Sequence, residues 1–279
     1  MPLENNLFVD IHCHVLPGID DGPCCSDMSL AMLESAKASG IVRIVATPHY
    51  ISWKYDNTGG KVAESAYGLR KASIEKNSRI FKDISLYSGC EALINPCIPE
   101  LLKKGEVLTL AGTSFVLVEL PVAFLPPQAW NFFYGLEIAG FRPVLAHPEK
   151  YEYLFKDEES ISLLINRGVL FQINSSSIIG INGRKTQKAA LDLIGRGACH
   201  FVASDSHSAR TRSFATMLKA YDFLCGIYNT DEVAGLFSSN GGLLLENKEP
   251  ERLCPKKKKS VWHFNKMISK KLSKTAELI

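Results

Sequence analysis

Apolar, β-branched runs alternate with amphipathic stretches through most of this chain, and this alternation limits the folds open to it. The strand-like runs are Leu7–Ile11, Ile41–Ala46, Ile84–Ser88, Phe115–Glu119, Pro143–Ala146, Val169–Ile173 and His200–Ala203. The helix-like stretches between them are Asp27–Ala38, Lys61–Asn77, Gln128–Ala139, Glu158–Asn166, Arg184–Arg196 and Thr211–Leu224. Roughly seven strand–helix units predict an α/β fold whose parallel strands close, or nearly close, into a barrel. A doubly wound sheet is the alternative.

Glycines mark the ends of several predicted helices. Gly40, Gly140, Gly168 and Gly197 each follow a helix-like stretch and precede a strand, as expected for C-terminal caps. Neither a long repeat nor a linker interrupts the pattern before about residue 251. We therefore expect one barrel domain over residues 1–252 and a separate tail over residues 253–279.

Cysteine usage and the lack of long apolar segments favour a reduced, cytoplasmic protein. The sequence holds no run of about twenty apolar residues that could span a bilayer, and its first residues do not resemble a signal peptide. Of the eight cysteines, Cys13, Cys90 and Cys199 fall in or beside predicted core strands, and Cys24-Cys25 lacks the spacing of a zinc site. We interpret them as free thiols.

The net charge of +3 conceals a mildly acidic body with a basic tail. From Pro255 onward there are eight lysines and one glutamate, whereas the preceding residues carry 24 basic and 28 acidic side chains. The body therefore gives no compositional reason to bind nucleic acid. In the tail, apolar residues recur at helical spacing among the lysines. This favours either an amphipathic segment lying on an anionic membrane surface or a disordered, solvated tail.

Histidines and carboxylates gather where the predicted strands end. The first strand ends at His12-Cys13-His14 and is followed by Asp20-Asp21-Gly22-Pro23. The later strands end at Thr47-Pro48-His49, Glu91, Glu119, His147-Pro148-Glu149 and Ser204-Asp205-Ser206-His207. In a parallel barrel the carboxyl ends of all strands meet at one face, so these side chains should converge.

Each of these residues alone has an ordinary structural explanation, such as a turn or a hydrogen-bonded pair. Together they do not, because so many charged groups in one barrel mouth would be costly to bury without compensating cations. Histidine and carboxylate ligands, without any need for cysteine, favour manganese, iron or zinc. The candidate ligands exceed what one ion uses, so we expect two or three divalent ions of the kind that polarise a phosphoryl group.

Taken in order, these motifs resemble those of the PHP (polymerase and histidinol phosphatase) superfamily. More narrowly, they resemble the manganese-dependent protein-tyrosine phosphatases of bacterial capsule and exopolysaccharide operons. The segment Gln172–Ser177, followed by Gly180, is also similar to that subfamily. The likeness extends from about residue 7 to about residue 245 and implies a distorted (β/α)7 TIM-like barrel.

The resemblance also implies a set of metal ligands. One metal would be held by His12, His14, Glu91 and Asp205; a second would share Glu91 and add Glu119 and His147; a third would use Asp21, His49 and His207. Manganese is the implied metal, with iron, zinc, cobalt or magnesium as alternatives. The implied activity is hydrolysis of phosphotyrosine in proteins, in which water attacks phosphorus in line.

Basic side chains beside the metals are expected to orient the phosphate. Arg212, and with it Arg210, follow the Asp205-x-His207 motif and match the subfamily's basic position. After His147-Pro148-Glu149 this chain has Lys150, where the subfamily usually carries arginine. Lysine keeps the charge but lacks the planar, bidentate guanidinium, so we expect activity with weaker phosphate positioning.

The implied substrate is a tyrosine-phosphorylated protein, namely a membrane-associated bacterial tyrosine autokinase that controls capsular or exopolysaccharide synthesis and export. Such a partner suits a cytoplasmic protein that reaches the inner face of the cell membrane through its basic tail, and the resemblance also suggests a homo-oligomer. One alternative is a PHP-type phosphoesterase acting on a small phosphomonoester such as histidinol phosphate, or on nucleic-acid ends. Another is a metal-binding adaptor without turnover, although an adaptor would not need so many ligands.

Overall fold

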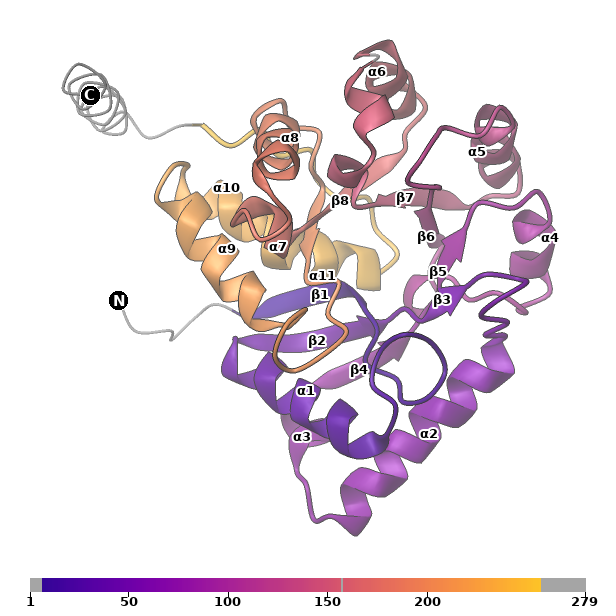
Figure 1. Cartoon of the computed structure of the whole chain (residues 1–279), viewed down its shortest axis with the longest axis vertical. Helices are drawn as coiled ribbons and strands as arrows, with labels where there is room; N and C mark the ends of the chain where they lie inside the picture. Colours follow the sequence, from indigo (N-terminus) through magenta and orange to yellow (C-terminus); the bar gives the residue numbers. More distant parts are fainter. Residues whose placement is uncertain (1–6, 157, 257–279) are drawn as a thin grey trace, which may run out of the picture.

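All named strands of this chain pair in parallel, and the helices surround them (Figure 1). The computed structural model describes residues 7–156 and 158–256. The strands are β1 (Phe8–Cys13), β2 (Ile41–Ala46), β3 (His49–Tyr50), β4 (Ser85–Ser88), β5 (Glu91–Leu93), β6 (Phe115–Glu119), β7 (Arg142–Ala146), β8 (Leu170–Asn174) and β9 (Phe201–Ala203).

Most helices follow strands along the chain. They are α1 (Ser26–Ala38), α2 (Gly59–Glu75), α3 (Ile80–Asp83), α4 (Ile98–Lys103), α5 (Ala129–Ile138), α6 (Glu158–Asn166), α7 (Ser175–Ile178), α8 (Arg184–Gly195), α9 (Ala215–Cys225), α10 (Thr230–Ala234) and α11 (Asn240–Leu245). Shorter turns are η1 (Leu110–Gly112), η2 (Pro148–Lys150), η3 (Glu152–Phe155) and the π-helical η4 (Gly235–Ser239).

Two of the barrel strands are interrupted, which divides the hydrogen-bonded ladder into two sheets. One sheet has the order β1-β2-β4 and the other β3-β5-β6-β7-β8-β9. Between β2 and β3 lies Pro48, which has no N–H to donate to the ladder. Backbone hydrogen bonds continue across the gaps, from Gly89 N–H to the Ala46 carbonyl and from Glu91 N–H to the Pro48 carbonyl. Counted this way, β2 with β3 and β4 with β5 each act as one strand of the barrel.

The barrel closes between β1 and the segment that follows β9. His14 N–H donates to the Ser206 carbonyl at 2.8 Å, and Asp205 N–H donates to the His12 carbonyl at 2.9 Å. The first and last strands therefore meet, which a doubly wound open sheet would not allow. The predicted distorted (β/α)7 barrel is confirmed.

The barrel interior is apolar, and its amino-terminal end is covered by α11 and η1. Val9, Ile11, Leu117 and Val144 belong to one buried cluster, and Leu244 of α11 packs into the same cluster. A second, larger cluster lies between the strands and the outer helices. With the lower end filled, polar groups can gather only at the opposite end, where the strands have their carboxyl termini.

The periodicity located the long elements and missed the short ones. The four predicted glycine caps adopt the left-handed backbone expected of them, with φ between 67° and 82°. The pattern did not predict β3 or β5, which are too short to show alternation. The pattern also predicted a helix from Thr211, whereas α9 begins at Ala215. Residues 208–212 instead form a loop in which His207 N–H and Ser208 N–H both donate to the Arg212 carbonyl.

The chain remains attached to the barrel through Lys256. Arg252 donates to the Gly197 carbonyl, and Lys256 N–H donates to Glu232. The basic tail expected over residues 253–279 lies outside the described residues from position 257 onward. Within the described part, no helix combines the length and apolar character needed to cross a membrane.

Candidate metal centre

An extra residue in β1 turns its two histidines toward the barrel mouth. Asp10 lies opposite Ile44 and Cys13 lies opposite Ala46, so β1 advances three residues while β2 advances two. Ile11 consequently faces the interior cluster and Cys13 the outer one. The buried Asp10 carboxylate holds this bulge, since it accepts hydrogen bonds from His12 N–H and from Ser204 N–H.

Glu91 is the centre of the site. It is 1% exposed, and burial alone would raise its pKa, but the surrounding imidazoles hold its pKa well below the usual range. Its Oε2 lies 3.2 Å from His12 Nε2, 3.3 Å from His14 Nε2 and 3.1 Å from His49 Nδ1, and its Oε1 lies 3.1 Å from His147 Nε2. One carboxylate therefore faces four histidines: two from the end of β1, one from β3 and one that follows β7.

Asp205 faces the β1 histidines from the other side. Its Oδ1 lies 3.6 Å from Nε2 of both His12 and His14. Its Oδ2 accepts from Lys150 Nζ at 2.8 Å and from Asn174 Nδ2 at 2.7 Å. Burial opposes ionisation, but the Lys150 ammonium and nearby imidazoles hold the pKa of Asp205 well below its usual range. The carboxylate is thus kept ionised and fixed in place.

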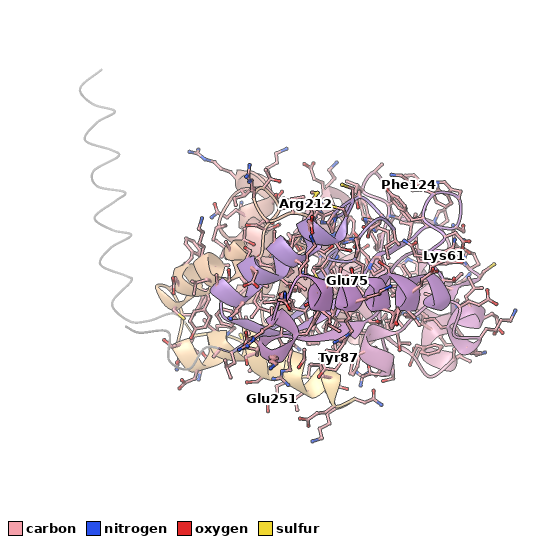
Figure 2. The ribbon with its side chains drawn as sticks, turned by 90° about the horizontal axis from the view of Figure 1, so that it is seen from below. Lys61, Glu75, Tyr87, Phe124, Arg212 and Glu251 are labelled. Carbon is pink, nitrogen blue, oxygen red and sulfur yellow. The ribbon has the colours of Figure 1, made fainter. Side chains whose placement is uncertain are left out.

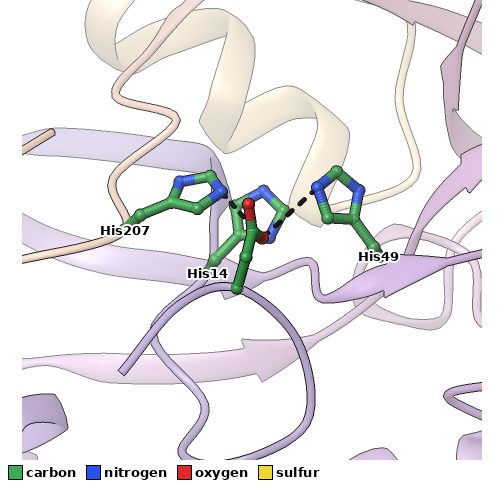
Figure 3. A group of neighbouring side chains, drawn as sticks. His14, His49 and His207 are labelled. Carbon is green, nitrogen blue, oxygen red and sulfur yellow. Dashed lines mark ion pairs between the residues drawn. The ribbon is translucent and has the colours of Figure 1, made fainter. Parts of the chain in front are cut away.

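Three histidines surround Asp21 at the outer edge of the cluster. Figure 3 shows His14 between His207 and His49, with ion pairs drawn to a common carboxylate. Asp21 Oδ1 lies 3.3 Å from His207 Nε2 and 3.6 Å from His49 Nε2. The adjacent His207 imidazole lowers the pKa of Asp21, which is nearly half exposed. This part of the site is the one most open to solvent.

Glu119 completes the cluster at the end of β6. Its Oε2 lies 3.7 Å from His49 Nδ1, and its Oε1 lies 3.9 Å from His147 Nε2. Burial and the charge of Glu91 raise the pKa of Glu119 to about 7. The neighbouring carboxylates of Glu91 and Glu119 repel each other unless positive charge lies between them.

The two β1 histidines are oriented by residues behind them. His12 Nδ1 lies 2.8 Å from Gln172 Oε1, and His14 Nδ1 lies 2.7 Å from Asp20 Oδ2. Each contact satisfies one ring nitrogen with an acceptor, which leaves Nε2 as a lone-pair donor facing the carboxylates. The sequence interpretation assigned no role to Gln172, Asp20 or Asp10. An ionisable residue inside an apolar strand, as Asp10 is, was the available signal.

The donor atoms fit divalent cations. Among the described residues, buried side-chain atoms without a hydrogen-bond partner include Glu91 Oε2, His49 Nδ1 and His207 Nε2. In neutral imidazoles the two unpaired nitrogens direct lone pairs at carboxylate oxygens, an arrangement that a cation relieves. The nine predicted ligands fall into four overlapping groups whose donor atoms lie within 4.8 Å of one another. His147 is grouped with His12 and Glu91, and His14 with Asp21, His49 and His207.

Two of these residues have strained backbones. His147 has φ of 36° and Asp205 has φ of 50°, a region that residues with a Cβ rarely adopt. His147 directly follows β7, and Asp205 lies two residues after the end of β9. The left-handed turn at each position directs the side chain into the barrel mouth. Strain of about 1 kcal/mol or more at such positions is typical of functional sites.

The predicted cations differ in how they meet the cluster. Arg212 donates to Asp205 Oδ1 at 2.9 Å, opposite Lys150. Both line a cavity of about 60 Å³, together with Asn182 and Thr211. Arg210 is exposed, and no ion pair connects its side chain to the described part of the cluster. Lys150 and Arg212 are therefore the better placed pair for an anionic group.

The remaining nearby polar residues have structural partners. Glu149 is buried and accepts from Asn174 N–H at 3.0 Å. His200 is buried below the site, where its Nδ1 accepts from Phe171 N–H. Five of the seven histidines in the sequence reach the cluster; His200 does not, and His263 lies outside the described residues.

Comparison with known proteins identifies the family. The family described as "Capsular polysaccharide synthesis, CpsB/CapC" matches residues 8–246. The chain is 34% identical to the tyrosine-protein phosphatase YwqE of Bacillus subtilis over 250 residues, covering 89% of this chain and 95% of that protein. It is 32% identical to the putative tyrosine-protein phosphatase CapC of Staphylococcus aureus, over 89% of this chain and 95% of that protein.

A solved structure agrees with these relatives. Crystal structures of YwqE from Bacillus subtilis and CpsB from Streptococcus pneumoniae describe unique metal-dependent tyrosine phosphatases. The match has a TM-score of 0.81 and 34% identity, and it covers 90% of this chain and 99% of the other. The chain therefore belongs to the CpsB/CapC family of capsular polysaccharide synthesis proteins.

Proposed function

We propose that this protein is a metal-dependent protein-tyrosine phosphatase that uses two or three divalent cations, with manganese as the first candidate. The relatives at 34% and 32% identity carry the name tyrosine-protein phosphatase, and the matching solved structure is described as metal-dependent. One observation of this chain carries the proposal furthest: four histidines, from the ends of β1 and β7 and from β3, converge on the buried Glu91.

The proposed ligands are the nine residues of the cluster. They are His12, His14, Asp21, His49, Glu91, Glu119, His147, Asp205 and His207. Cations bound there would supply Lewis acidity that polarises a phosphoryl group and lowers the pKa of water. Gln172 and Asp20 would keep the β1 imidazoles in the tautomer that offers Nε2.

Lys150 and Arg212 are proposed to bind the phosphate oxygens. Both now pair with Asp205, and both line the cavity beside it. A phosphate entering that cavity would share their donors with Asp205, so its charge would be neutralised on the side away from the histidines. Arg210 lies in the same loop as Arg212, but its side chain is exposed and does not pair with the cluster in the described structure. We assign it a weaker, electrostatic role in phosphate binding.

Cysteine chemistry is not required. Cys13 and Cys90 are buried near the cluster, and burial raises the pKa of Cys13 far above its usual range and that of Cys90 to about 12. Neither thiol would be a thiolate nucleophile at neutral pH. The proposed nucleophile is water, and the phenolate leaving group, with a pKa near 10, needs less protonation than an alkoxide.

The proposed partner is a membrane-associated bacterial tyrosine kinase of capsule or exopolysaccharide export, met in the cytoplasm at the inner face of the membrane. We propose residues 1–252 as the catalytic domain and the basic tail as a peripheral membrane contact, and a homo-oligomer remains part of the proposal. Since Lys256 still bonds to the body, a chain ending there is the right truncation. Full-length protein should co-sediment with anionic liposomes and the truncated chain should not; equal binding by both would remove the membrane contact.

A manganese-supplemented turnover assay tests the activity. Phosphotyrosine, phosphoserine and histidinol phosphate are compared at equal concentration. We expect phosphotyrosine to be hydrolysed fastest. Equal rates on all three would contradict the specificity, faster histidinol phosphate turnover would favour a small-molecule phosphoesterase, and no turnover on any would contradict the enzyme.

A further inference from the structure

We propose that an aromatic lip on one side of the barrel mouth binds the phosphotyrosyl ring and an apolar residue beside it in the substrate. The lip consists of Trp53, Tyr55, Val122 and Phe124. This inference rests on the proposed phosphatase function and adds to it a determinant of substrate choice that lies apart from the metal cluster.

The lip residues lie in two loops at the carboxyl ends of neighbouring strands. Trp53 and Tyr55 follow β3, and Val122 and Phe124 follow β6; only β5 separates these strands in the sheet. Trp53 is 74% exposed, Val122 62% and Phe124 58%. In Figure 2, Phe124 lies at the same edge of the molecule as Arg212, whereas Tyr87 and Glu251 lie at the opposite edge. The lip therefore borders the mouth that holds the candidate site.

Tyr55 connects the lip to the metal cluster. Its ring lies nearly parallel to that of His49, with centroids 5.8 Å apart and planes at 11°. The ammonium of Lys54 lies 4.6 Å from the centroid of the Tyr55 ring. Asn57 donates to the carbonyl of His49 at 2.8 Å, which fixes the loop to the start of β3. The lip is therefore in direct ring contact with His49, a candidate metal ligand.

Both loops hold their backbones in place while their apolar side chains face solvent. Ile51 and Tyr55 exchange two backbone hydrogen bonds of 2.9 and 2.8 Å, so Trp53 lies in a tight turn between them. In the β6 loop, Leu120 N–H donates to the Tyr151 hydroxyl, and the Tyr153 hydroxyl donates to the Pro121 carbonyl, both at 3.0 Å. Apolar side chains presented by constrained loops lose little entropy on binding a partner.

The two sides of the mouth differ in chemistry. Lys150 and Arg212 lie on the side of β7 and β9, in a cavity whose lining is polar apart from Ile181. The lip lies on the side of β3 and β6, with the histidines and carboxylates between. A phosphoaryl group matches this arrangement: its phosphate faces the cations and its ring faces Tyr55. Trp53 and Phe124 would then meet the residue next to the tyrosine.

The test uses two phosphotyrosine peptides that differ only beside the tyrosine, one with leucines and one with glycines. The double variant Trp53→Ala/Phe124→Ala is compared with wild type and with Tyr67→Ala/Tyr134→Ala, which removes two exposed aromatic rings from α2 and α5. We expect wild type and the control to favour the leucine peptide. In the lip variant, KM for that peptide should rise roughly tenfold, the factor expected for one buried apolar side chain. The inhibition constant of inorganic phosphate should stay constant.

The outcomes separate this inference from the function beneath it. If wild type hydrolyses neither peptide, the phosphatase function fails and the lip's role fails with it. If wild type hydrolyses both and the lip variant keeps the same preference for leucine, the lip proposal alone is overturned. Loss of anionic-vesicle binding or of self-association in the lip variant, with unchanged peptide preference, would also overturn it, in favour of a lipid or second-copy surface.

Discussion

The carboxylate of Asp20 fixes the ring of His14: its Oδ2 accepts from His14 Nδ1 at 2.7 Å. The same oxygen accepts from the backbone N–H of His49 at 3.1 Å, and Oδ1 accepts from Gly22 N–H at 2.9 Å. One side chain thereby joins the end of β1, the start of β3 and the turn that carries Asp21. Asp20 therefore acts by positioning candidate ligands.

Replacing Asp20 by asparagine should weaken metal binding. An amide cannot present acceptors to all three N–H groups, so His14 loses its fixed orientation. Manganese affinity should fall roughly 10- to 100-fold, the usual loss when such a partner is removed. Calorimetric titration of metal-free protein measures it. Asp27→Asn, an exposed carboxylate paired with Lys76, is the control; equal affinity in both variants would contradict the positioning role.

Replacing Lys150 by arginine should raise kcat/KM. Lys150 donates to Asp205 Oδ2 at 2.8 Å and is only partly exposed, so a guanidinium there could keep that contact and offer a second donor to phosphate. We expect a gain of a few-fold and tighter inhibition by inorganic phosphate, both from steady-state kinetics. Lys150→Met should lose activity. A fall or no change in the arginine variant would count against the phosphate role.

Two adjacent glycines in α11 should respond oppositely to alanine. A Cβ on Gly241 would lie 2.7 Å from Val9 of β1, whereas a Cβ on Gly242 meets only the flexible end of Arg43. Alanine favours helix over glycine by about 0.5–1 kcal/mol, so Gly242→Ala should stabilise. Gly241→Ala should destabilise by about 1–3 kcal/mol through overpacking. Urea denaturation of both variants decides it, and equal stabilisation would show that α11 does not press on the barrel.

Stability should depend on His200 between about pH 4 and 6.5. Burial, aided by Arg252, lowers the pKa of His200 to about 4. Because the pKa of His200 is higher in the unfolded chain, that chain binds the proton first as pH falls. The stability that the neutral ring contributes is therefore complete above about pH 6.5 and is lost as pH falls toward 4. The loss is about 3 kcal/mol. His200→Asn keeps an acceptor for Phe171 N–H, and in urea denaturation its stability should fall less than wild type over this range. Parallel falls would refute the assignment.

Much of the fold and the candidate site could be predicted from the sequence, because alternation and strand-end chemistry are local signals. The long strands and helices follow from periodicity. The convergence of Glu91, His147 and Asp205 follows from the rule that parallel strands share one carboxyl face. The left-handed turns at His147 and Asp205 do not follow from either, since only the closed barrel determines how the chain leaves each strand.

What the sequence did not predict depends on contacts between distant segments. The β1 bulge is held by Asp10, in the first strand, bonding to Ser204, which directly follows the last strand. Gln172 meets His12 for the same reason. The sequence shows that Trp53 and Phe124 are apolar, but it does not show that their loops flank the same barrel mouth. These contacts join segments that only the closed barrel brings together, so the sequence alone does not predict them.

The most direct measurement is the metal content of the double variant His12→Ala/His14→Ala, taken together with its turnover of phosphotyrosine. Wild type should bind two or three manganese ions per chain. The variant should bind at least one fewer and lose turnover, with circular dichroism that matches wild type, because both histidines face the mouth and not the apolar core. Full metal content with wild-type turnover in the folded variant would contradict the metal centre.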